Sequence, residues 1–293
     1  MHAVIPTHDP DPARLEAAVV STLRVPGMSR VWVVDDGSAR PIERNSVLSD
    51  ARVTMLRQEN AGPSSARNAG LDAACASSPR ADAVVLLDDD DELIADGVQA
   101  MLRLADQLGA SAVVSAREQV YASSVGVRTE PKPVPSEWAD RVLPRAGDVF
   151  TPISLFGASG CLVAGPALRA GVRFDADLWI GEDRDLLRRC ADAGPIGVCA
   201  EPSVRVTMHD GGSNLSGPAH LERRVRDHLV LMGRHYEPVD DDVWKSATLW
   251  LVNQCAKAGR SQQAKPLAAA CAQRGWPIPF KTRARLWAKG RRA

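Results

Sequence analysis

The sequence lacks the features that mark membrane, secreted, zinc-binding and nucleic-acid-binding proteins. It has no uninterrupted apolar run of about 18 residues, which a membrane-spanning helix needs. No basic segment followed by an apolar core stands at its start, so we expect no signal peptide. The six cysteines form no Cys-x-x-Cys pair, which argues against zinc and favours reduced thiols. The 36 basic and 36 acidic residues balance, so no net charge attracts nucleic acid. We therefore expect a soluble, cytoplasmic protein.

Short apolar runs alternate with helical patterns along the first part of the chain. The 293 residues, of which 45% are hydrophobic, suffice for one large domain or two moderate ones. Strands are predicted at residues 3–5, 31–34, 53–56, 84–87 and 112–114. Strands that alternate with helices of ten to fifteen residues indicate right-handed βαβ units. The sequence therefore predicts an α/β fold with a mostly parallel sheet flanked by helices.

Two of these predicted strands run directly into acidic residues. Asp35 and Asp36 follow one strand, and four aspartates and a glutamate at residues 88–92 follow another. In a parallel sheet both clusters lie at the carboxyl edge, where open α/β sheets bind ligands. Crowded carboxylates repel one another unless a cation neutralises them, and Mg²⁺ or Mn²⁺ prefers oxygen ligands. The alternative, solvated turns that cap helices, requires only one acid at each place.

The second half of the chain is less regular. Several prolines occur within residues 118–157, and we expect this stretch to cover the sheet edge or to form a mobile loop. A strand is predicted near 160–163, and a helix after Asp183. Beyond residue 216 only helices are predicted, three in number. The tail at 281–293 has six basic residues and no acid, so it could contact an anionic membrane surface or be a solvated terminus.

Five motifs in this order resemble the family 2 glycosyltransferases. They are Ile-Pro-Thr-His at 5–8, Val-Val-Asp-Asp-Gly-Ser at 33–38, Glu-Asn-Ala-Gly-Pro-Ser-Ser-Ala-Arg-Asn-Ala-Gly at 59–70, Leu-Asp-Asp-Asp-Asp at 87–91 and Gly-Glu-Asp-Arg-Asp at 181–185. The resemblance implies a GT-A domain over residues 1–215, with a nucleotide-sugar half at 1–115 and an acceptor half at 116–215. Residues 216–293 form a helical C-terminal region.

The resemblance also implies an activity. Such enzymes invert the configuration of a sugar while they transfer it from a nucleoside diphosphate sugar to a hydroxyl group. The first expectation for this chain is a UDP-sugar donor, Mn²⁺ or Mg²⁺ as cofactor, and a glycan, lipid-linked or small-molecule acceptor. The basic tail adds peripheral membrane association as a second expectation for localisation.

Residue roles follow from the same resemblance. The residues expected at the nucleotide sugar are Pro6, Thr7, Asp36, Arg67, Asp88 and Asp89. Among them, Asp36 reads the nucleobase, Arg67 lies near the base or diphosphate, and Asp88 faces the ribose. Asp90 and His209 are expected at the metal. The family usually has a small residue where this chain has Asp89, so the choice among these acids stays open. Simpler readings are a turn at Asp36 and a surface arginine at Arg67.

The acidic pair Glu182 and Asp183 is the expected catalytic group. Inversion requires one base opposite the leaving group, and Asp183 matches the family's base. At a helix N-terminus its ionised form would be stabilised, which suits a proton acceptor. Glu182 would bind the acceptor or brace a backbone amide, whereas Arg184 and Asp185 are expected on the helix surface. The simpler reading of Asp183 is a helix cap.

Two rival functions remain open. A sugar nucleotidyltransferase would also hold metal and phosphates at strand ends, but it needs a glycine-rich basic loop after its first strand. That place reads Pro-Thr-His-Asp-Pro at residues 6–10. The second rival is a non-catalytic module that binds sugar nucleotides and recruits partners, and the intact Glu182–Asp183 pair speaks against it.

Overall fold

The computed structural model describes residues 1–77, 82–123, 126–151, 155–208 and 220–290. The chain divides into two compact units. Unit 1 comprises Met1–Ala146, Ser154–Asp177 and Glu182–His209, and unit 2 comprises Gly147–Ile153, Leu178–Gly181 and Asp210–Ala293. No helix in these described ranges combines the length and apolar character needed to cross a bilayer. The boundaries expected at residues 115 and 215 stay predictions.

The amino-terminal half of unit 1 is a parallel sheet. Four strands lie in the spatial order β3 (Val53–Gln58), β2 (Arg30–Asp36), β1 (His2–Thr7) and β4 (Ala83–Leu86). β1 pairs in parallel with β2 on one side and with β4 on the other. Every residue of β1 and β4 is buried, as expected for strands covered on both faces. The predicted strands are thereby confirmed, and their carboxyl ends share one edge.

Beyond β4 the ten-stranded sheet, counted over the described residues, becomes mixed. The additional strands are β9 (Leu162–Ala164), β6 (Ala112–Ser123), β10 (Ile196–Met208), β5 (Glu92–Leu93), β7 (Gly126–Lys132) and β8 (Arg141–Val142). β9 is antiparallel to both β4 and β6, so β6 and its parallel neighbour β10 run in the direction of β4. The α/β class with a central sheet flanked by helices is confirmed. The sheet is parallel from β3 to β4, but antiparallel strands make it mixed beyond β4.

Of the two alternatives expected for residues 118–157, cover for the sheet edge or a mobile loop, the mobile loop is wrong for the first part. β6 continues to Ser123, and β7 returns antiparallel to it, so a hairpin replaces the loop. Proline normally excludes a strand because it lacks an N–H donor. Pro131 is tolerated here because β7 pairs with β6 alone among the described strands and is an edge strand.

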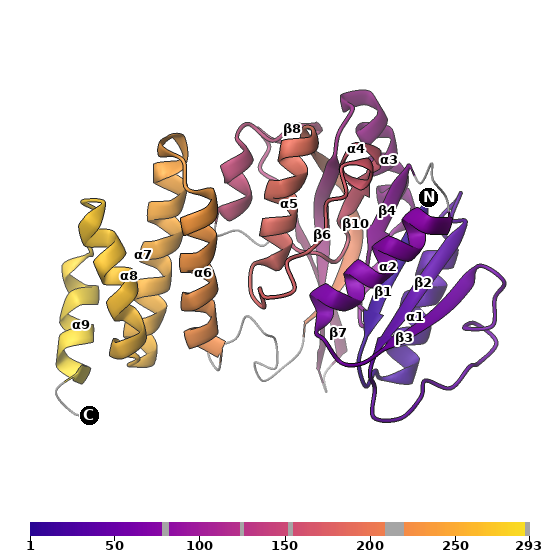
Figure 1. Cartoon of the computed structure of the whole chain (residues 1–293), viewed down its shortest axis with the longest axis horizontal. Helices are drawn as coiled ribbons and strands as arrows, with labels where there is room; N and C mark the ends of the chain where they lie inside the picture. Colours follow the sequence, from indigo (N-terminus) through magenta and orange to yellow (C-terminus); the bar gives the residue numbers. More distant parts are fainter. Residues whose placement is uncertain (78–81, 124–125, 152–154, 209–219, 291–293) are drawn as a thin grey trace. The chain divides into compact units, whose positions relative to one another are not determined.

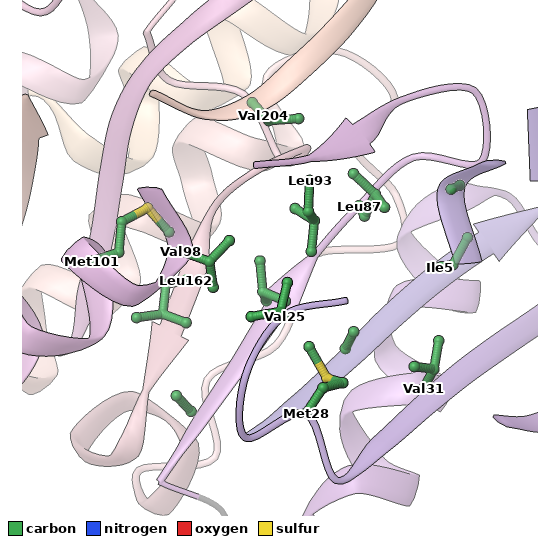
Figure 2. Close-up of a cluster of buried hydrophobic side chains, with 14 of the residues drawn as sticks. Ile5, Val25, Met28, Val31, Leu87, Leu93, Val98, Met101, Leu162 and Val204 are labelled. Carbon is green, nitrogen blue, oxygen red and sulfur yellow. The ribbon is translucent and has the colours of Figure 1, made fainter. Parts of the chain in front are cut away.

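Helices cover both faces of the parallel sheet. They are α1 (Pro12–Leu23), α2 (Pro63–Ser77) and α3 (Ala95–Leu108). Side chains alternate along β1, so Ala3 and Ile5 face the core with α1 and α3, whereas Val4 faces α2. In Figure 2, Val98 and Met101 of α3 lie on the same side of the sheet as Ile5. Each such large buried side chain stabilises the fold by roughly 1.5–3 kcal/mol.

Glycine is required where α2 meets the sheet. A Cβ atom on Gly70 would lie 2.4 Å from Cγ1 of Val4, so any side chain there would push the helix away from β1. Gly70 is the last residue of the Ala-Arg-Asn-Ala-Gly segment in α2. The close contact therefore fixes the depth of Arg67, one turn earlier in the helix.

Unit 2 is helical, as predicted. After the short helix η1 (Ala146–Phe150), it contains α6 (Leu221–His235), η3 (Pro238–Asp240), α7 (Asp241–Ala258), α8 (Ser261–Gln273) and α9 (Phe280–Gly290) (Figure 1). Trp244 of α7 is fully buried and stacks on Phe150 with ring centroids 4.4 Å apart. Helix α9 takes up most of the basic tail and, among the described residues, is a fourth α-helix where three were expected. Membrane contact through this tail stays a prediction.

Among its described residues, unit 1 contains two further α-helices. They are α4 (Gly165–Arg169) and α5 (Glu182–Ala193). The helix expected after Asp183 is present, but it begins at Glu182, so the acidic pair lies in its first turn; it ends at Ala193.

Candidate active site

The carboxyl edge of the parallel sheet gathers several of the predicted residues. Thr7 ends β1, Asp36 ends β2, and the chain leaves β4 two residues before Asp88. The hydroxyl of Thr7 donates a hydrogen bond to the carboxylate of Asp89. Pro6 is buried in β1 next to Thr7. Parallel pairing therefore brings the predicted donor-side acids to one edge.

Asp36 organises the loop before α2. Its Oδ1 accepts hydrogen bonds from Gln58 Nε2 at 2.7 Å and from the backbone N–H of Ala61 at 2.9 Å, and its Oδ2 accepts from the N–H of Gly62 at 2.8 Å. The side chain is buried. Asp36 therefore fixes the Asn-Ala-Gly loop on β2. Whether it also reads a nucleobase stays a prediction.

Arg67 joins the edge of the sheet to α5. Its guanidinium donates to Asp88 Oδ1 at 2.7 Å and to Glu182 Oε1 at 3.3 Å, and it lies 5.3 Å above the ring of Phe174. Burial disfavours the charged guanidinium, but Asp88 and Glu182 outweigh that effect and hold the pKa of Arg67 above its usual value. The reading of Arg67 as a surface arginine is wrong, because its side chain is only 6% exposed.

The last acid of the run, Asp91, has structural partners. Its Oδ2 accepts from Ser159 Oγ at 2.5 Å, and its Oδ1 accepts from the backbone N–H of Thr207 at 2.8 Å. The hydroxyl of Thr207 in turn donates to the backbone oxygen of Asp90. Asp91 is buried, whereas the preceding three acids are half-buried. Asp91 therefore fastens the acidic loop to β10, and Asp88, Asp89 and Asp90 face the more accessible side.

Burial and mutual repulsion raise the pKa values of two acids in this loop. Burial, followed by repulsion from Asp90 and Asp88, raises the pKa of Asp89 to about 6, although its hydrogen bond from Thr7 opposes the shift. Burial and the charge of Asp88 raise the pKa of Asp91 to about 8. A bound cation would reduce the repulsion among these neighbouring carboxylates.

The residues of the acidic loop fit a divalent cation bound together with substrate phosphates. No cluster of three His, Cys, Asp or Glu side chains arranged for a metal occurs in the described ranges. Mg²⁺ commonly binds through one or two carboxylates, with phosphates and water completing its shell. Asp88 has a side chain that is 38% exposed and offers such an oxygen donor, as does half-buried Asp90. His209, the other expected ligand, lies outside the described residues.

The predicted catalytic pair begins α5. The backbone N–H of Arg184 donates to Asp183 Oδ1 at 2.7 Å. Burial raises the pKa of Asp183, and the charges of Arg184, Arg67 and Arg117 oppose this shift. Burial and the charge of Asp183 likewise raise the pKa of Glu182 to about 7. The helix N-terminus was expected to stabilise the ionised form of Asp183. The net effect has the opposite sign, which makes Asp183 a stronger proton acceptor.

Arg117 is a site residue that the sequence analysis missed. It lies on β6 and donates to the backbone oxygen of Leu155 at 2.5 Å. Burial lowers its pKa, and the charges of Asp183 and Asp91 oppose the shift. Its Nε is buried without a hydrogen-bond partner among the described residues. The signal that could have found it is weaker than the one that singled out the acids, because Arg117 comes three residues after the apolar run predicted at 112–114.

The position of one further residue was predicted wrongly, and the role of another was not predicted. Asp185 was expected on the helix surface, but it is fully buried and pairs with Arg189 of the next turn at 2.7 Å. Ser159 was also missed. It donates to Asp91 and accepts from the backbone N–H of Asp88 at 3.2 Å. A single serine far from the acids in sequence gives no signal that reasoning from pattern could use.

The shifted carboxyl groups predict how stability depends on pH. Asp89 and Asp91 have pKa values of about 6 and about 8, against an ordinary value of 3.8. At pH values between the ordinary pKa and the raised pKa of each group, the folded protein binds more protons than the unfolded protein. The free energy of unfolding therefore falls as pH rises from about 4 to about 8. Without divalent cations we expect a lower Tm at pH 8 than at pH 5 by calorimetry. Asp91→Asn should reduce this difference.

The exposed aspartate Asp106 on α3 supplies the control for this measurement. Asp106→Asn should leave the difference in Tm between pH 5 and pH 8 as it is in the unaltered protein. A Tm that rises from pH 5 to pH 8 would contradict the raised pKa values. Mn²⁺ should raise the Tm more at pH 8 than at pH 5, because more carboxylates are then ionised.

Comparison with known proteins gives similarities at the levels of family, sequence and fold. The sequence model of Glycosyl transferase family 2 matches residues 3–165. The chain is 30% identical to the succinoglycan biosynthesis protein ExoW of Rhizobium meliloti (strain 1021), over 73% of this chain and 67% of ExoW. It is also 30% identical to ExoO of the same organism, but spans only 61% of that protein. The structure of S. aureus TarS 1-349 in complex with UDP-GlcNAc aligns with a TM-score of 0.54 at 14% identity, covering 92% of this chain and 87% of the TarS 1-349 chain.

Proposed function

This chain belongs to glycosyl transferase family 2, and we propose that it transfers a sugar with inversion from a UDP-sugar to a hydroxyl group of a glycan. The UDP donor is supported by the TarS complex with UDP-GlcNAc, which shares the fold. The glycan acceptor is supported by the names of ExoW and ExoO, both succinoglycan biosynthesis proteins. Lipid-linked and small-molecule hydroxyl groups are the alternative acceptors.

The observation that carries this proposal is the ion-pair bridge through Arg67. It joins Asp88, at the end of a strand that would hold the donor, to Glu182, beside the proposed base. A transferase requires this proximity, because the acceptor hydroxyl must reach the anomeric carbon while the diphosphate leaves. A sugar nucleotidyltransferase has no such requirement for a base beside the sugar, and the family membership sets that rival aside.

Asp88 and Asp90 are the proposed holders of Mn²⁺ or Mg²⁺. A bound divalent cation supplies Lewis-acid stabilisation of the negative charge on the departing diphosphate. Thr7 holds Asp89 by a hydrogen bond, and Asp91 fastens the loop to β10, so these two acids fix the position of the other two.

Asp183 is the proposed general base. As the acceptor oxygen forms its bond to the anomeric carbon, the bond from that carbon to the diphosphate breaks, and the proton of the hydroxyl passes to the carboxylate of Asp183. Its raised pKa makes the carboxylate a better proton acceptor. Glu182 is proposed to orient the acceptor, with Arg67 holding its carboxylate in place.

Calorimetric titration of UDP, GDP and dTDP, each with and without Mn²⁺, tests the proposed donor site. We expect UDP to bind most tightly and to lose most of its affinity without Mn²⁺. Asp90→Ala should weaken only the Mn²⁺-dependent part of UDP binding, because the loop fastened through Asp91 remains. The absence of metal-dependent binding for all three nucleotides would remove the proposal and favour the non-catalytic module.

A further inference from the structure

One face of α6 holds the segment Leu178–Gly181, which directly precedes the catalytic pair. Both backbone N–H groups of Trp179 and Ile180 donate to Oδ2 of Asp227, each at 3.1 Å. The carboxylate is buried, with 1% of its side chain exposed, and it also accepts from Arg226. The buried carboxylate of Asp227 therefore binds two backbone amides of a segment that is neither helix nor strand.

Two more residues of α6 contact the same segment. The guanidinium of Arg223 lies 4.1 Å from the ring centroid of Trp179. A Cβ atom on Gly181 would lie 2.9 Å from Cδ1 of Leu231. Residues 223, 227 and 231 are spaced by four, so they form one stripe along the helix. The stripe contacts Trp179, Ile180 and Gly181 in chain order.

The backbone at the end of this segment is also constrained. Gly181 has φ +85°, in the left-handed region that residues with a Cβ rarely adopt, and the next residue begins α5. The turn at Gly181 therefore lies directly before the helix that begins with Glu182 and Asp183. The carboxylate of Asp227 accepts its hydrogen bonds from the segment and from Arg226, and the chain continues from the segment directly into Glu182 and Asp183.

We propose that Asp227 is a positioning residue for the transfer reaction: by fixing the amides of Trp179 and Ile180, it sets the placement of Asp183 opposite the donor sugar. The inference rests on the proposed role of Asp183 as the base. It gives the helical C-terminal unit a part in catalysis, although the reacting groups belong to unit 1. A misplacement of a catalytic group by about 1 Å can reduce turnover by about a hundredfold.

Asp227→Ala tests this assignment against a matched variant. Its turnover, measured as hydrolysis of UDP-hexoses with water as the acceptor, should fall by at least about tenfold. The affinity for UDP with Mn²⁺ should stay unchanged, because the proposed donor-side residues Asp36, Arg67 and Asp88 keep their contacts. Hydrogen exchange of a peptide covering residues 178–183 should rise. Asp227→Asn should restore both values, because one amide oxygen can accept from both N–H groups.

Asp241→Ala is the control within the same unit. Asp241 of α7 accepts from the hydroxyl of Tyr236 at 2.9 Å and from Trp276 Nε1 at 3.1 Å, so its loss weakens unit 2 without releasing residues 178–181. We expect a lower Tm with unchanged turnover and exchange. Turnover or exchange in Asp227→Ala that matches Asp241→Ala would overturn the assignment. A wild-type protein that hydrolyses no UDP-hexose would instead overturn the proposed function, and the exchange data would still decide whether Asp227 holds the segment.

Discussion

Asp183→Asn is expected to reduce sugar transfer by roughly 10²–10⁴-fold, the usual contribution of a general base. Asparagine has nearly the same shape, and its amide oxygen can accept the hydrogen bond that Arg184 N–H now donates to Asp183. The amide cannot accept the proton of the acceptor hydroxyl. The change therefore removes the chemistry and keeps the start of α5 in place.

The measurement is turnover together with nucleotide binding in the same preparation. UDP affinity in the presence of Mn²⁺ should be nearly that of the unaltered protein, since the donor-side contacts of Asp88 and Arg67 remain. Asp192→Asn, on the exposed side of the same helix, supplies the control and should leave turnover unchanged. Equal losses of turnover and UDP affinity in Asp183→Asn would take Asp183 out of the role of base.

The pH profile of turnover adds a second readout for the same residue. Burial raises the pKa of Asp183, so its carboxylate becomes available as a base at higher pH than an exposed aspartate would. Turnover should rise with pH on the acidic limb of the profile, and Asp183→Asn should lack this rise in its residual activity.

Hydrophobic pattern and strand-end chemistry predicted much of this molecule. Each strand of the parallel part of the sheet is a short apolar run, and the position of Asp36 and Asp88 follows once those strands are parallel. The close approach of α2, which carries Arg67, to β1 also has a local cause, because Gly70 leaves room for Val4. Such features depend on one strand or one helix and can be read from neighbouring residues.

The features that sequence reasoning missed depend on residues far apart in the chain. The hydrogen bonds of Asp91 come from Ser159 and Thr207, which lie more than sixty residues away. The raised pKa of Asp183 results from burial by the tertiary structure, which outweighs the local effect of the helix N-terminus. The pairing of β6 with β7 was missed because the prolines of this stretch favour the prediction of a loop. Proline is tolerated in β7 because an edge strand does not need every N–H group for pairing.

Arg67→Met is expected to lower the free energy of unfolding by about 3–5 kcal/mol, since it removes one partner of a buried ionic network. The methionine side chain fills similar space without charge. Glu182, whose side chain is 13% exposed, would lose its cationic partner, and Asp88 would lose the shorter of the two contacts. UDP binding should fall as well, because Asp88 would no longer be held at the sheet edge.

The loss in free energy of unfolding caused by Arg67→Met should grow as pH rises, because Arg67 affects the pKa of Glu182. Burial and the charge of Asp183 raise the pKa of Glu182 to about 7, against an ordinary 4.5, and Arg67 is the charged group that opposes this shift. Without Arg67 the pKa rises further, so the folded protein binds still more protons than the unfolded protein above pH 4.5. The free energy of unfolding then falls more steeply as pH rises, and the deficit is larger at pH 8 than at pH 5.

Urea denaturation at both pH values measures this deficit. Arg128→Met on β7 removes an exposed ion pair with Glu130 and should cost less than about 1 kcal/mol at either pH. Adding Glu182→Gln to Arg67→Met should recover part of the loss at pH 8, because glutamine cannot ionise. A deficit that is equal at pH 5 and pH 8, and that the second change does not reduce, would mean that Arg67 stabilises the fold by packing on Phe174 rather than by holding the two carboxylates together.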